Sequence, residues 1–477
     1  MEDIFQTIQD NNYYKYLTSD GWVYSSSNQF LEVNSPIDES IVGSLSAISV
    51  EEVNEAISKV TPLQLSWAQM PLNKRVEIMI KASVLLKRNV DYLTNLIHKE
   101  VGKSIEDSKD EVNRTADLIE YYAQQALRIS EQTQFGDSYP NYKSKKIAIN
   151  ARVPYGIVLA IPPFNYPLNE SAPKIVSALV MGNACIVKVP THGGITNLHL
   201  AQIFVEAGVP CGVLTVLSGS GSVIGDEIVK NDAIDVINFT GSYETAKHIA
   251  LVAGIKKLIL GLSGKDSAIV CADSDLNHAV RECVVGSLSY SGQRCTAIKK
   301  IFVEENIYDN FLDLFLAQVT TNDYGPVIDI KTANYIEQLK EDAISKGAKI
   351  IYGERINNLE FKPYILTDVT DDMRISWEEP FGPILPIMKF SSIDDAVDKT
   401  NRSEYGLQAS IFTKDINKAF DVASRLNVGT VQINGKDSRS PDHFPFSGAK
   451  KSGLGNVQGA KYLLEEVTRI KSIVVNL

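Results

Sequence analysis

The chain has 477 residues, carries a formal net charge of −11, and is 44% hydrophobic and 22% charged. These proportions are ordinary for a folded globular protein and exclude a fibrous or disordered chain. At ~150 residues per domain, the length predicts two large domains or three smaller ones. The acidic balance argues against a general nucleic-acid binder. No apolar run reaches the ~18 residues of a membrane span, so we expect no membrane contact.

The number and spacing of the cysteines, together with the first twelve residues, indicate the cellular compartment in which the protein is found. Five cysteines stand at positions 185, 211, 271, 283 and 295, without CxxC or CxH spacing. This pattern predicts neither a disulfide framework nor a structural zinc site, and we expect no bound metal. Free thiols are typical of a reducing environment, and the polar, acidic segment 1–12 does not resemble a signal peptide. We therefore expect a cytoplasmic protein.

The first third of the chain is predicted to be helical. Ser49 and Glu52 form a capping-box pattern ahead of an apolar stripe that starts at Val53. A second long helix is expected from about Ser104 to Ile129, and Arg114 lies on a face apart from its apolar stripe.

From Ile147 onward, short apolar runs alternate with helical stretches. Such runs are typical of strands covered on both faces, and the alternation is the rhythm of a doubly wound parallel sheet. A first series of strands is expected at Ile157–Ile161, Ala184–Val189, Val213–Leu217, Val236–Phe239 and Leu258–Leu260. A second series is expected at Ser267–Cys271, Lys300–Val303, Ile384–Phe390, Ser410–Thr413 and Gly429–Ile433. The predicted fold class is α/β with two doubly wound domains.

Two further strands, Lys146–Val153 and Thr468–Leu477, have no sheet of their own in sequence order. We expect them to pair with each other or with a neighbouring subunit, because unpaired apolar edges promote aggregation.

Two turns that follow predicted strands are candidate phosphate sites. Gly221 and Gly225 would let the backbone approach a phosphate at a helix start, although an ordinary turn explains them equally well. Ser242 either meets a pyrophosphate at the end of its strand or simply caps the next helix.

Cys295 is the candidate nucleophile. It follows a flexible glycine, and the neighbouring guanidinium of Arg294 favours the thiolate. The alternative is a small buried hydrophobe, which a single cysteine usually is. Two other segments favour the nucleophile: Ile161-Pro-Pro-Phe-Asn165-Tyr-Pro and Glu378-Glu-Pro-Phe-Gly-Pro383.

Together these segments resemble the aldehyde dehydrogenase superfamily, in that family's order and from about Trp22 to Val475. The resemblance implies a dinucleotide-binding domain of residues 1–136 and 155–263, and a catalytic domain of residues 264–455. It also implies a β oligomerisation arm of residues 137–154 and 456–477, which would hold the two unplaced strands. We therefore expect a homo-oligomer, namely a tetramer.

The resemblance also implies the chemistry of the site. Cys295 would attack the aldehyde carbon, and its backbone N–H and the Asn165 side chain would form the oxyanion hole. By local rules alone, Asn165 is equally a turn residue. Glu379 and Phe381 would hold the nicotinamide ribose and ring, although Glu379 is equally explained as an exposed side chain. The remaining residues implied to contact the cofactor are Phe164, Lys188, Thr191 and Leu262, with Gly221, Gly225 and Ser242.

The loop from Lys188 to Thr191 resembles the family's grip on the adenosine ribose. Relatives that prefer NAD often place a glutamate near this point, and its charge would repel a 2′-phosphate. Thr191 is small and neutral. We therefore expect NADP as the cofactor, with NAD as the alternative.

Within the family, the chain most resembles the non-phosphorylating glyceraldehyde-3-phosphate dehydrogenases. Their phosphate pocket maps onto Arg114, Tyr166, Arg294 and Arg439, with Thr296 beside the nucleophile. Three arginines and a phenol match a phosphate dianion, although any single arginine is more often a surface or ion-paired residue. The implied partner is a small phosphorylated aldehyde. The implied reaction is irreversible oxidation of glyceraldehyde 3-phosphate to 3-phosphoglycerate.

One position departs from the family. Its Glu-Leu-Gly-Gly-Lys segment reads Gly261-Leu-Ser-Gly-Lys265 here, so the usual general base is missing. A CoA-acylating dehydrogenase, an enzyme for free glyceraldehyde and a weakened cofactor-binding homologue are therefore the alternatives. Glu170, one helical turn beyond Tyr166, is the expected replacement base. The alternative for Glu170 is a surface residue in a first helical turn.

Overall fold

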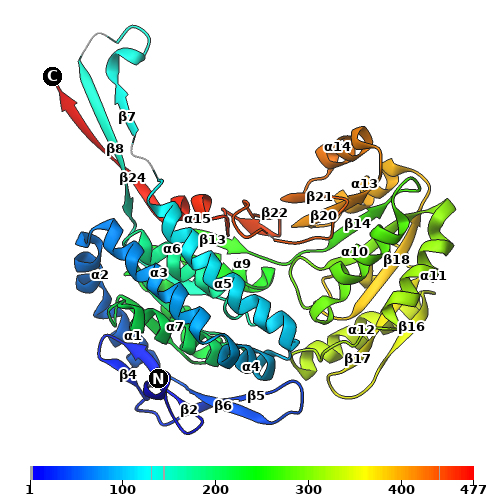
Figure 1. Cartoon of the computed structure of the whole chain (residues 1–477), viewed down its shortest axis with the longest axis horizontal. Coiled ribbons are helices and arrows are strands. Elements are labelled where there is room, and N and C mark those ends of the chain that lie inside the picture. Colours follow the sequence, from blue (N-terminus) through cyan, green and yellow to red (C-terminus); the bar gives the residue numbers. More distant parts are fainter. Residues whose placement is uncertain (1–3, 130–131, 143–144, 440) are drawn as a thin grey trace.

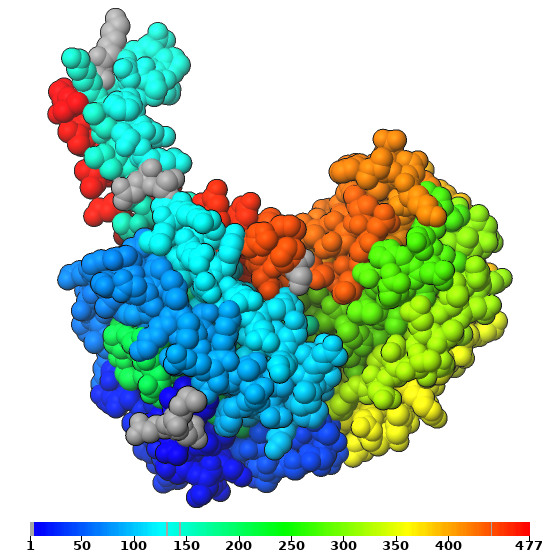
Figure 2. All heavy atoms as spheres, in the orientation of Figure 1, coloured from blue at the N-terminus to red at the C-terminus, as the bar shows by residue number. Residues whose placement is uncertain are grey.

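The computed structural model describes residues 4–129, 132–142, 145–439 and 441–477. Two lobes, each built on a large sheet, face one another, and a narrow arm projects from the first lobe (Figure 1). Figure 2 shows the same arm standing clear of the lobes, with the C-terminal strand along its side. The fold class is the predicted one, with two α/β lobes and a β arm.

The first lobe is built on an eight-stranded sheet in the order β23-β13-β12-β9-β10-β11-β3-β4. Its five central strands are the predicted first series: β9 (Ile157–Ile161), β10 (Ala184–Lys188), β11 (Leu214–Leu217), β12 (Val236–Thr240) and β13 (Lys257–Gly261). They are parallel. The short strands β3 (Tyr16–Thr18), β4 (Gly21–Val23) and β23 (Gly453–Leu454) extend the two edges antiparallel.

Both faces of this sheet are covered, which explains why its strands are apolar throughout. In β9, Val158 and Ala160 belong to one hydrophobic core, whereas Ile157 and Leu159 belong to another on the opposite face. The first core is completed by α3 (Leu72–Arg88), α4 (Val90–Val101), α5 (Ile105–Ala126), α6 (Ser171–Val180) and α7 (Gly194–Ala207). The second is completed by α1 (Val50–Ser58), α8 (Gly221–Lys230) and α9 (Tyr243–Val252).

The N-terminal segment corrects the sequence prediction in part. The capping box is present, since Ser49 accepts the Glu52 N–H at 3.2 Å and Glu52 accepts the Ser49 N–H at 2.8 Å. However, the chain before it is not helical. It forms β3, β4 and a small four-stranded sheet from β1 (Gln9–Asp10), β2 (Tyr13–Tyr14), β5 (Phe30–Asn34) and β6 (Ile41–Ser46). The helix α2 (Val60–Gln69) continues from α1.

The second lobe is a seven-stranded sheet in the order β16-β17-β18-β15-β14-β20-β21. The predicted second series is confirmed as β14 (Asp266–Val270), β15 (Ile298–Glu304), β18 (Ile384–Phe390), β20 (Gln408–Phe412) and β21 (Thr430–Ile433). The strands β16 (Lys349–Arg355) and β17 (Phe361–Thr367) were not predicted. The covering helices are α10 (Leu276–Leu288), α11 (Tyr308–Val319), α12 (Ile330–Ser345), α13 (Ile393–Asn401) and α14 (Ile416–Arg425).

The arm is a three-stranded antiparallel sheet in the order β24-β8-β7. The strand β8 (Lys146–Pro154) pairs along its whole length with β24 (Thr468–Asn476), and β7 (Gln132–Phe135) adds the other edge. The two unplaced strands of the sequence therefore pair with each other. Just before β24, the helix α15 (Ala460–Glu466) packs on α5 and α6 of the first lobe. No helix in the described ranges has the length and apolarity needed to cross a bilayer.

Candidate active site

Nine of the predicted site residues, including Cys295 and Asn165, line a cavity of about 430 Å³ between the lobes. The first lobe contributes the loops that follow β9, β10, β12 and β13, where ligands bind in doubly wound sheets. The second lobe contributes Cys295, Glu379 and Phe381. The other lining residues are Pro163, Phe164, Asn165, Glu170, Pro190, Thr191, His192, Thr240, Gly241, Ser242, Gly261, Leu262 and Ser263.

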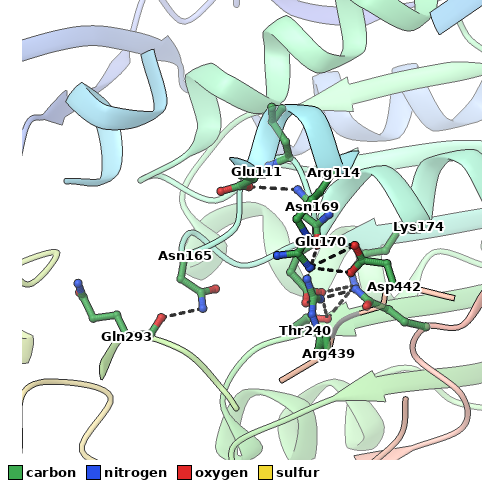
Figure 3. Close-up of polar contacts among 12 residues, drawn as sticks. Glu111, Arg114, Asn165, Asn169, Glu170, Lys174, Thr240, Gln293, Arg439 and Asp442 are labelled. Carbon is green, nitrogen blue, oxygen red and sulfur yellow. Dashed lines mark hydrogen bonds and ion pairs between the residues drawn. The ribbon is translucent and has the colours of Figure 1, made fainter. Parts of the chain in front are cut away.

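Cys295 lies in a constrained loop after α10. Tyr290 and Ser291 both have positive φ, 53° and 52°, in the region that non-glycine residues rarely occupy. The carbonyl of Gln293 accepts the Asn165 side-chain amide at 2.9 Å, and the Cys295 carbonyl accepts Lys299 Nζ at 2.5 Å. The amide that was expected to complete an oxyanion hole therefore lies against the loop that carries the thiol (Figure 3).

The electrostatics of Cys295 correct one expectation. Burial, together with the negative charge of Glu170, raises the pKa of its thiol to about 11, while Arg439 and Lys299 act in the opposite direction. The predicted stabilisation of a thiolate by Arg294 is wrong. The Arg294 guanidinium donates to the carbonyls of Gly286 and Val285, at the C-terminal turn of α10.

Arg294 precedes Cys295 in the sequence, but its guanidinium binds α10 and does not join the other residues that were expected to bind the phosphate. Arg114, Tyr166 and Arg439 do come together, since the Arg439 guanidinium lies 5.6 Å from the centre of the Tyr166 ring and its charge acts on Arg114. Thr296 is buried next to Cys295.

Arg114 and Arg439 each already bind a carboxylate of the protein. Arg114 binds Asp442 through Nη2 at 2.9 Å and Nε at 3.2 Å. Arg439 donates to one oxygen of Glu170 and to the Asn169 side chain (Figure 3). Burial alone would lower the pKa of Arg439, but the charges of Glu170 and Asp442 outweigh burial and raise it.

Glu170 is part of the cavity and not a surface residue. Only 4% of it is exposed, and it is the N-cap residue of α6 rather than a member of its first turn. Its backbone N–H donates to the Tyr166 carbonyl at 3.0 Å, so the predicted one-turn spacing from Tyr166 is confirmed. Its second oxygen lies 3.4 Å from Thr240 Oγ1 and 3.5 Å from Lys174 Nζ.

Gly261 ends β13 at the wall of the cavity, where the family's general base was expected. A Cβ at this position would lie 3.1 Å from Thr240 Oγ1 and 2.9 Å from Val457 Cγ1. The end of β13 is therefore closely packed around a residue without a side chain.

The part of the cavity wall formed by Phe164, Phe381 and Glu379 suits a nicotinamide and its ribose. The rings of Phe164 and Phe381 meet edge to face, with centres 5.9 Å apart. Glu379, which is largely buried, accepts the Gly264 N–H at 3.0 Å and pairs with Lys299 at 3.1 Å. The alternative of an exposed Glu379 is therefore excluded. These contacts present an aromatic edge and a fixed carboxylate to the cavity, together with the apolar Leu262.

The residues expected at the adenosine and phosphates follow the ends of three strands of the first sheet, β10, β11 and β12. Thr191 lines the cavity after β10, and burial lowers the pKa of Lys188 to about 8. Ser242 caps α9 by accepting the Thr245 N–H at 3.2 Å, so its capping role is observed and it also lines the cavity. Gly221 begins α8, and a Cβ at Gly221 or Gly225 would meet no atom within 4 Å. The helix start at Gly221 is thus open to a ligand.

Sequence analysis missed the side chains that hold this site together. Glu111, on α5, accepts the N–H groups of Leu168 and Asn169 at 2.9 and 3.1 Å and also binds Lys103. Lys103 Nζ in turn lies 3.7 Å from the centre of the Tyr166 ring. The sequence contains no local signal for this pair, because Lys103 and Glu111 stand among polar and charged residues and not in an apolar run. In the described ranges no three His, Cys, Asp or Glu side chains are grouped to hold a metal ion.

Two doubly wound lobes that enclose a cysteine, an asparagine amide and an aromatic cofactor pocket define a dehydrogenase of the aldehyde-oxidising class. The chain belongs to the aldehyde dehydrogenase family, whose model matches residues 22–473. It is 42% identical over 474 residues to the NADP-dependent glyceraldehyde-3-phosphate dehydrogenase of Streptococcus equinus, covering 97% of this chain and 99% of that protein. The identically named protein of Arabidopsis thaliana is 39% identical, over 99% of this chain and 97% of that one.

A solved structure agrees with these relatives. The NADP-dependent glyceraldehyde-3-phosphate dehydrogenase of Bacillus halodurans C-125, complexed with NADP, superposes with a TM-score of 0.95. The two chains are 42% identical, and the match covers 98% of this chain and all of the other.

Proposed function

We propose that this protein oxidises glyceraldehyde 3-phosphate to 3-phosphoglycerate with NADP and without inorganic phosphate. The observation that supports this most directly is the shared cavity of Cys295, Asn165, Glu379 and Phe381, in a chain whose relatives carry that name over nearly their whole length.

Cys295 is the proposed nucleophile. Its Sγ bonds to the aldehyde carbon, and the oxygen of the resulting thiohemiacetal faces the Asn165 amide and the Cys295 backbone N–H. Glu379 and Phe381 would hold the nicotinamide of NADP, which would supply the hydride acceptor for this oxidation. The acyl group remains on Sγ as a thioester, and water then releases the acid. The raised pKa of Cys295 means that its proton must be removed as the aldehyde is attacked.

The proposed phosphate pocket consists of Arg114, Arg439 and Tyr166, with Arg294 behind the nucleophile. A phosphate dianion would share Arg114 with Asp442 and Arg439 with Glu170, so the pocket binds its ligand against two carboxylates already present. Arg294 contributes by holding the nucleophile loop to α10.

We also propose that NADP is preferred to NAD. Thr191 places a small neutral side chain in the cavity wall, next to the buried Lys188, so no carboxylate at this position faces a 2′-phosphate. NAD remains the alternative cofactor.

The experiment is a substrate and cofactor panel with analysis of the acid product. We expect NADPH and 3-phosphoglycerate from glyceraldehyde 3-phosphate in the absence of phosphate and CoA. An acyl-CoA product that forms only when CoA is present would identify a CoA-acylating dehydrogenase. This is an alternative because Gly261 stands where the family's general base is expected. If kcat/KM for free glyceraldehyde equals kcat/KM for glyceraldehyde 3-phosphate, the proposed phosphate pocket is contradicted.

The proposed assembly is a homotetramer that works in the cytoplasm. The arm strand β24 has one edge free of β8 and exposes Ile470, Ile473 and Val475, which an isolated subunit would leave in water. All five cysteines are free thiols, as in a reducing compartment.

A further inference from the structure

We propose that Glu170 is the general base for thioester hydrolysis and that it replaces, from the start of α6, the carboxylate that Gly261 lacks at the end of β13. This inference rests on the function proposed above, and it assigns one of that reaction's steps to a residue from a different element.

The two positions converge on Thr240. A Cβ at position 261 would lie 3.1 Å from Thr240 Oγ1, and the same hydroxyl lies 3.4 Å from Oε2 of Glu170. A side chain from the end of β13 would therefore start beside the atom that Glu170 reaches from α6. All three residues line the cavity that contains Cys295.

The charges around Thr240 require an anion at this place. Lys174 is fully buried, donates to Thr240 Oγ1 at 2.7 Å and lies 3.5 Å from Glu170 Oε2. Arg439 is also buried and binds the other carboxylate oxygen. Among the described residues, Lys174 and Arg439 both form their ion pairs with Glu170. Without Glu170, these two buried cations would lose the carboxylate that pairs with them, which is strongly destabilising.

The two oxygens of Glu170 are held differently. Oε1 is bound by Arg439 and lies 3.4 Å from the Gln458 amide, whereas both contacts of Oε2 are long, at 3.4 and 3.5 Å. Oε2 is thus the oxygen with capacity for another hydrogen bond. The charge of Glu170 also reaches the nucleophile, because it is the largest influence on the Cys295 pKa after burial.

In the proposed step, the oxygen of a water molecule bonds to the acyl carbon of the thioester while one of its protons passes to Oε2 of Glu170. The tetrahedral adduct then collapses. Its C–S bond breaks, the electron pair returns to Sγ of Cys295, and the product leaves as a carboxylic acid. Thr240 and Lys174 keep the carboxylate in position through their hydrogen bonds.

The test compares Glu170→Gln with wild type in stopped-flow and steady-state assays with glyceraldehyde 3-phosphate and NADP. The amide keeps the size of the side chain but cannot take the proton. We expect a normal first burst of NADPH, accumulation of an acyl group on Cys295 by mass spectrometry, and steady turnover lower by roughly 10²- to 10⁴-fold. Hydroxylamine, a nucleophile that needs no base, should restore turnover in this variant and release a hydroxamate.

The control is Glu77→Gln, the same change at an exposed site on α3, which should behave as wild type. Wild-type turnover of Glu170→Gln would overturn the inference. So would loss of the burst in a variant that melts at the wild-type temperature, since Glu170 would then serve acylation. A wild-type enzyme that forms no NADPH from glyceraldehyde 3-phosphate would instead overturn the function proposed above.

Two further variants cover the case in which the glutamine variant does not fold. Glu170→Asp keeps an anion for Arg439 but withdraws it by one methylene, and it should slow hydrolysis while sparing the burst. Glu170→Gln with Gly261→Glu and Val457→Ala returns the carboxylate to β13, with the valine trimmed because its Cγ1 would lie 2.9 Å from the new Cβ. Recovered hydrolysis in this triple variant supports the relocation. Hydrolysis no faster than in Glu170→Gln contradicts it.

Discussion

Asp442 binds the guanidinium of Arg114 through both carboxylate oxygens, across 328 positions of sequence. Arg114 is 30% exposed and Asp442 is 15% exposed, so water screens the pair only in part. The acid stands in the region where the substrate phosphate is proposed to bind, and it competes with that phosphate for the arginine.

Asp442→Asn should therefore raise kcat/KM for glyceraldehyde 3-phosphate. Removing one repulsive charge at a partly exposed pair is worth about 1 kcal/mol, or roughly fivefold. Free glyceraldehyde should be unaffected. Asp110→Asn is the matched control, because Asp110 contacts the same arginine at 3.5 Å from a more exposed position and should have a smaller effect. A loss for both substrates would mean that Asp442 holds Arg114 in place.

The alkylation rate of Cys295 should depend steeply on pH. With its thiol pKa raised to about 11, the reactive thiolate is scarce at neutral pH, and the rate should increase about tenfold per pH unit between pH 7 and pH 10. Iodoacetamide labelling followed by mass spectrometry of the Cys295 peptide measures this. A profile that levels off near pH 7 would contradict the raised pKa.

Glu170→Gln should move that profile to lower pH. The carboxylate raises the thiol pKa, so its neutralisation must lower the pKa and make alkylation at neutral pH faster. The same variant is expected to hydrolyse its thioester more slowly, so the two readouts change in opposite directions. An unchanged alkylation profile would show that the charge of Glu170 does not act on Cys295.

Thr191→Glu should weaken NADP binding far more than NAD binding. A carboxylate close to the 2′-phosphate costs roughly ten- to hundredfold in affinity at the effective dielectric of a protein surface. Titration calorimetry with both cofactors measures the difference. Thr191→Gln has the same length without the charge and separates electrostatics from size. A wild-type protein that binds NAD more tightly than NADP would contradict the role given to this loop.

Ile473→Lys with Val475→Lys should break the proposed tetramer into smaller species without unfolding the lobes. Both side chains are exposed on β24, at 55% and 38%, and charges there oppose burial in a neighbouring subunit. Sedimentation velocity reports the species present. Lys471→Gln, a polar change on the same strand, is the control. A wild-type protein that sediments as a monomer would contradict the proposed tetramer.

Strands covered on both faces were predictable because burial on both sides leaves an unbroken apolar run, as in Ile157–Ile161. The strand β3 was missed because it has only three residues, and Tyr16–Thr18 offers no alternation to read. The strand β16 was missed because Lys349–Arg355 is largely exposed, whereas β17 was overlooked although Phe361–Thr367 is almost entirely buried.

The candidate site divides in a similar way. The one-turn relation of Glu170 to Tyr166 is local and was predictable, whereas its contacts with Thr240 and Arg439 join positions 70 and 269 residues apart, which no local pattern encodes. Arg294 was misjudged because the backbone at Tyr290 and Ser291 turns through positive φ. Adjacency in the chain therefore did not set the direction of its side chain.

The pairing of β8 with β24 has a consequence for biosynthesis. A ribosome completes residues 146–154 long before it adds residues 468–476, so β8 has only β7 as a partner during most of translation. The arm sheet is complete only after residues 468–476 have been made. Any assembly that uses β24 must therefore wait until residues 468–476 have been made, and a chain that lacks them would keep β7 paired with β8 without the third strand of the arm.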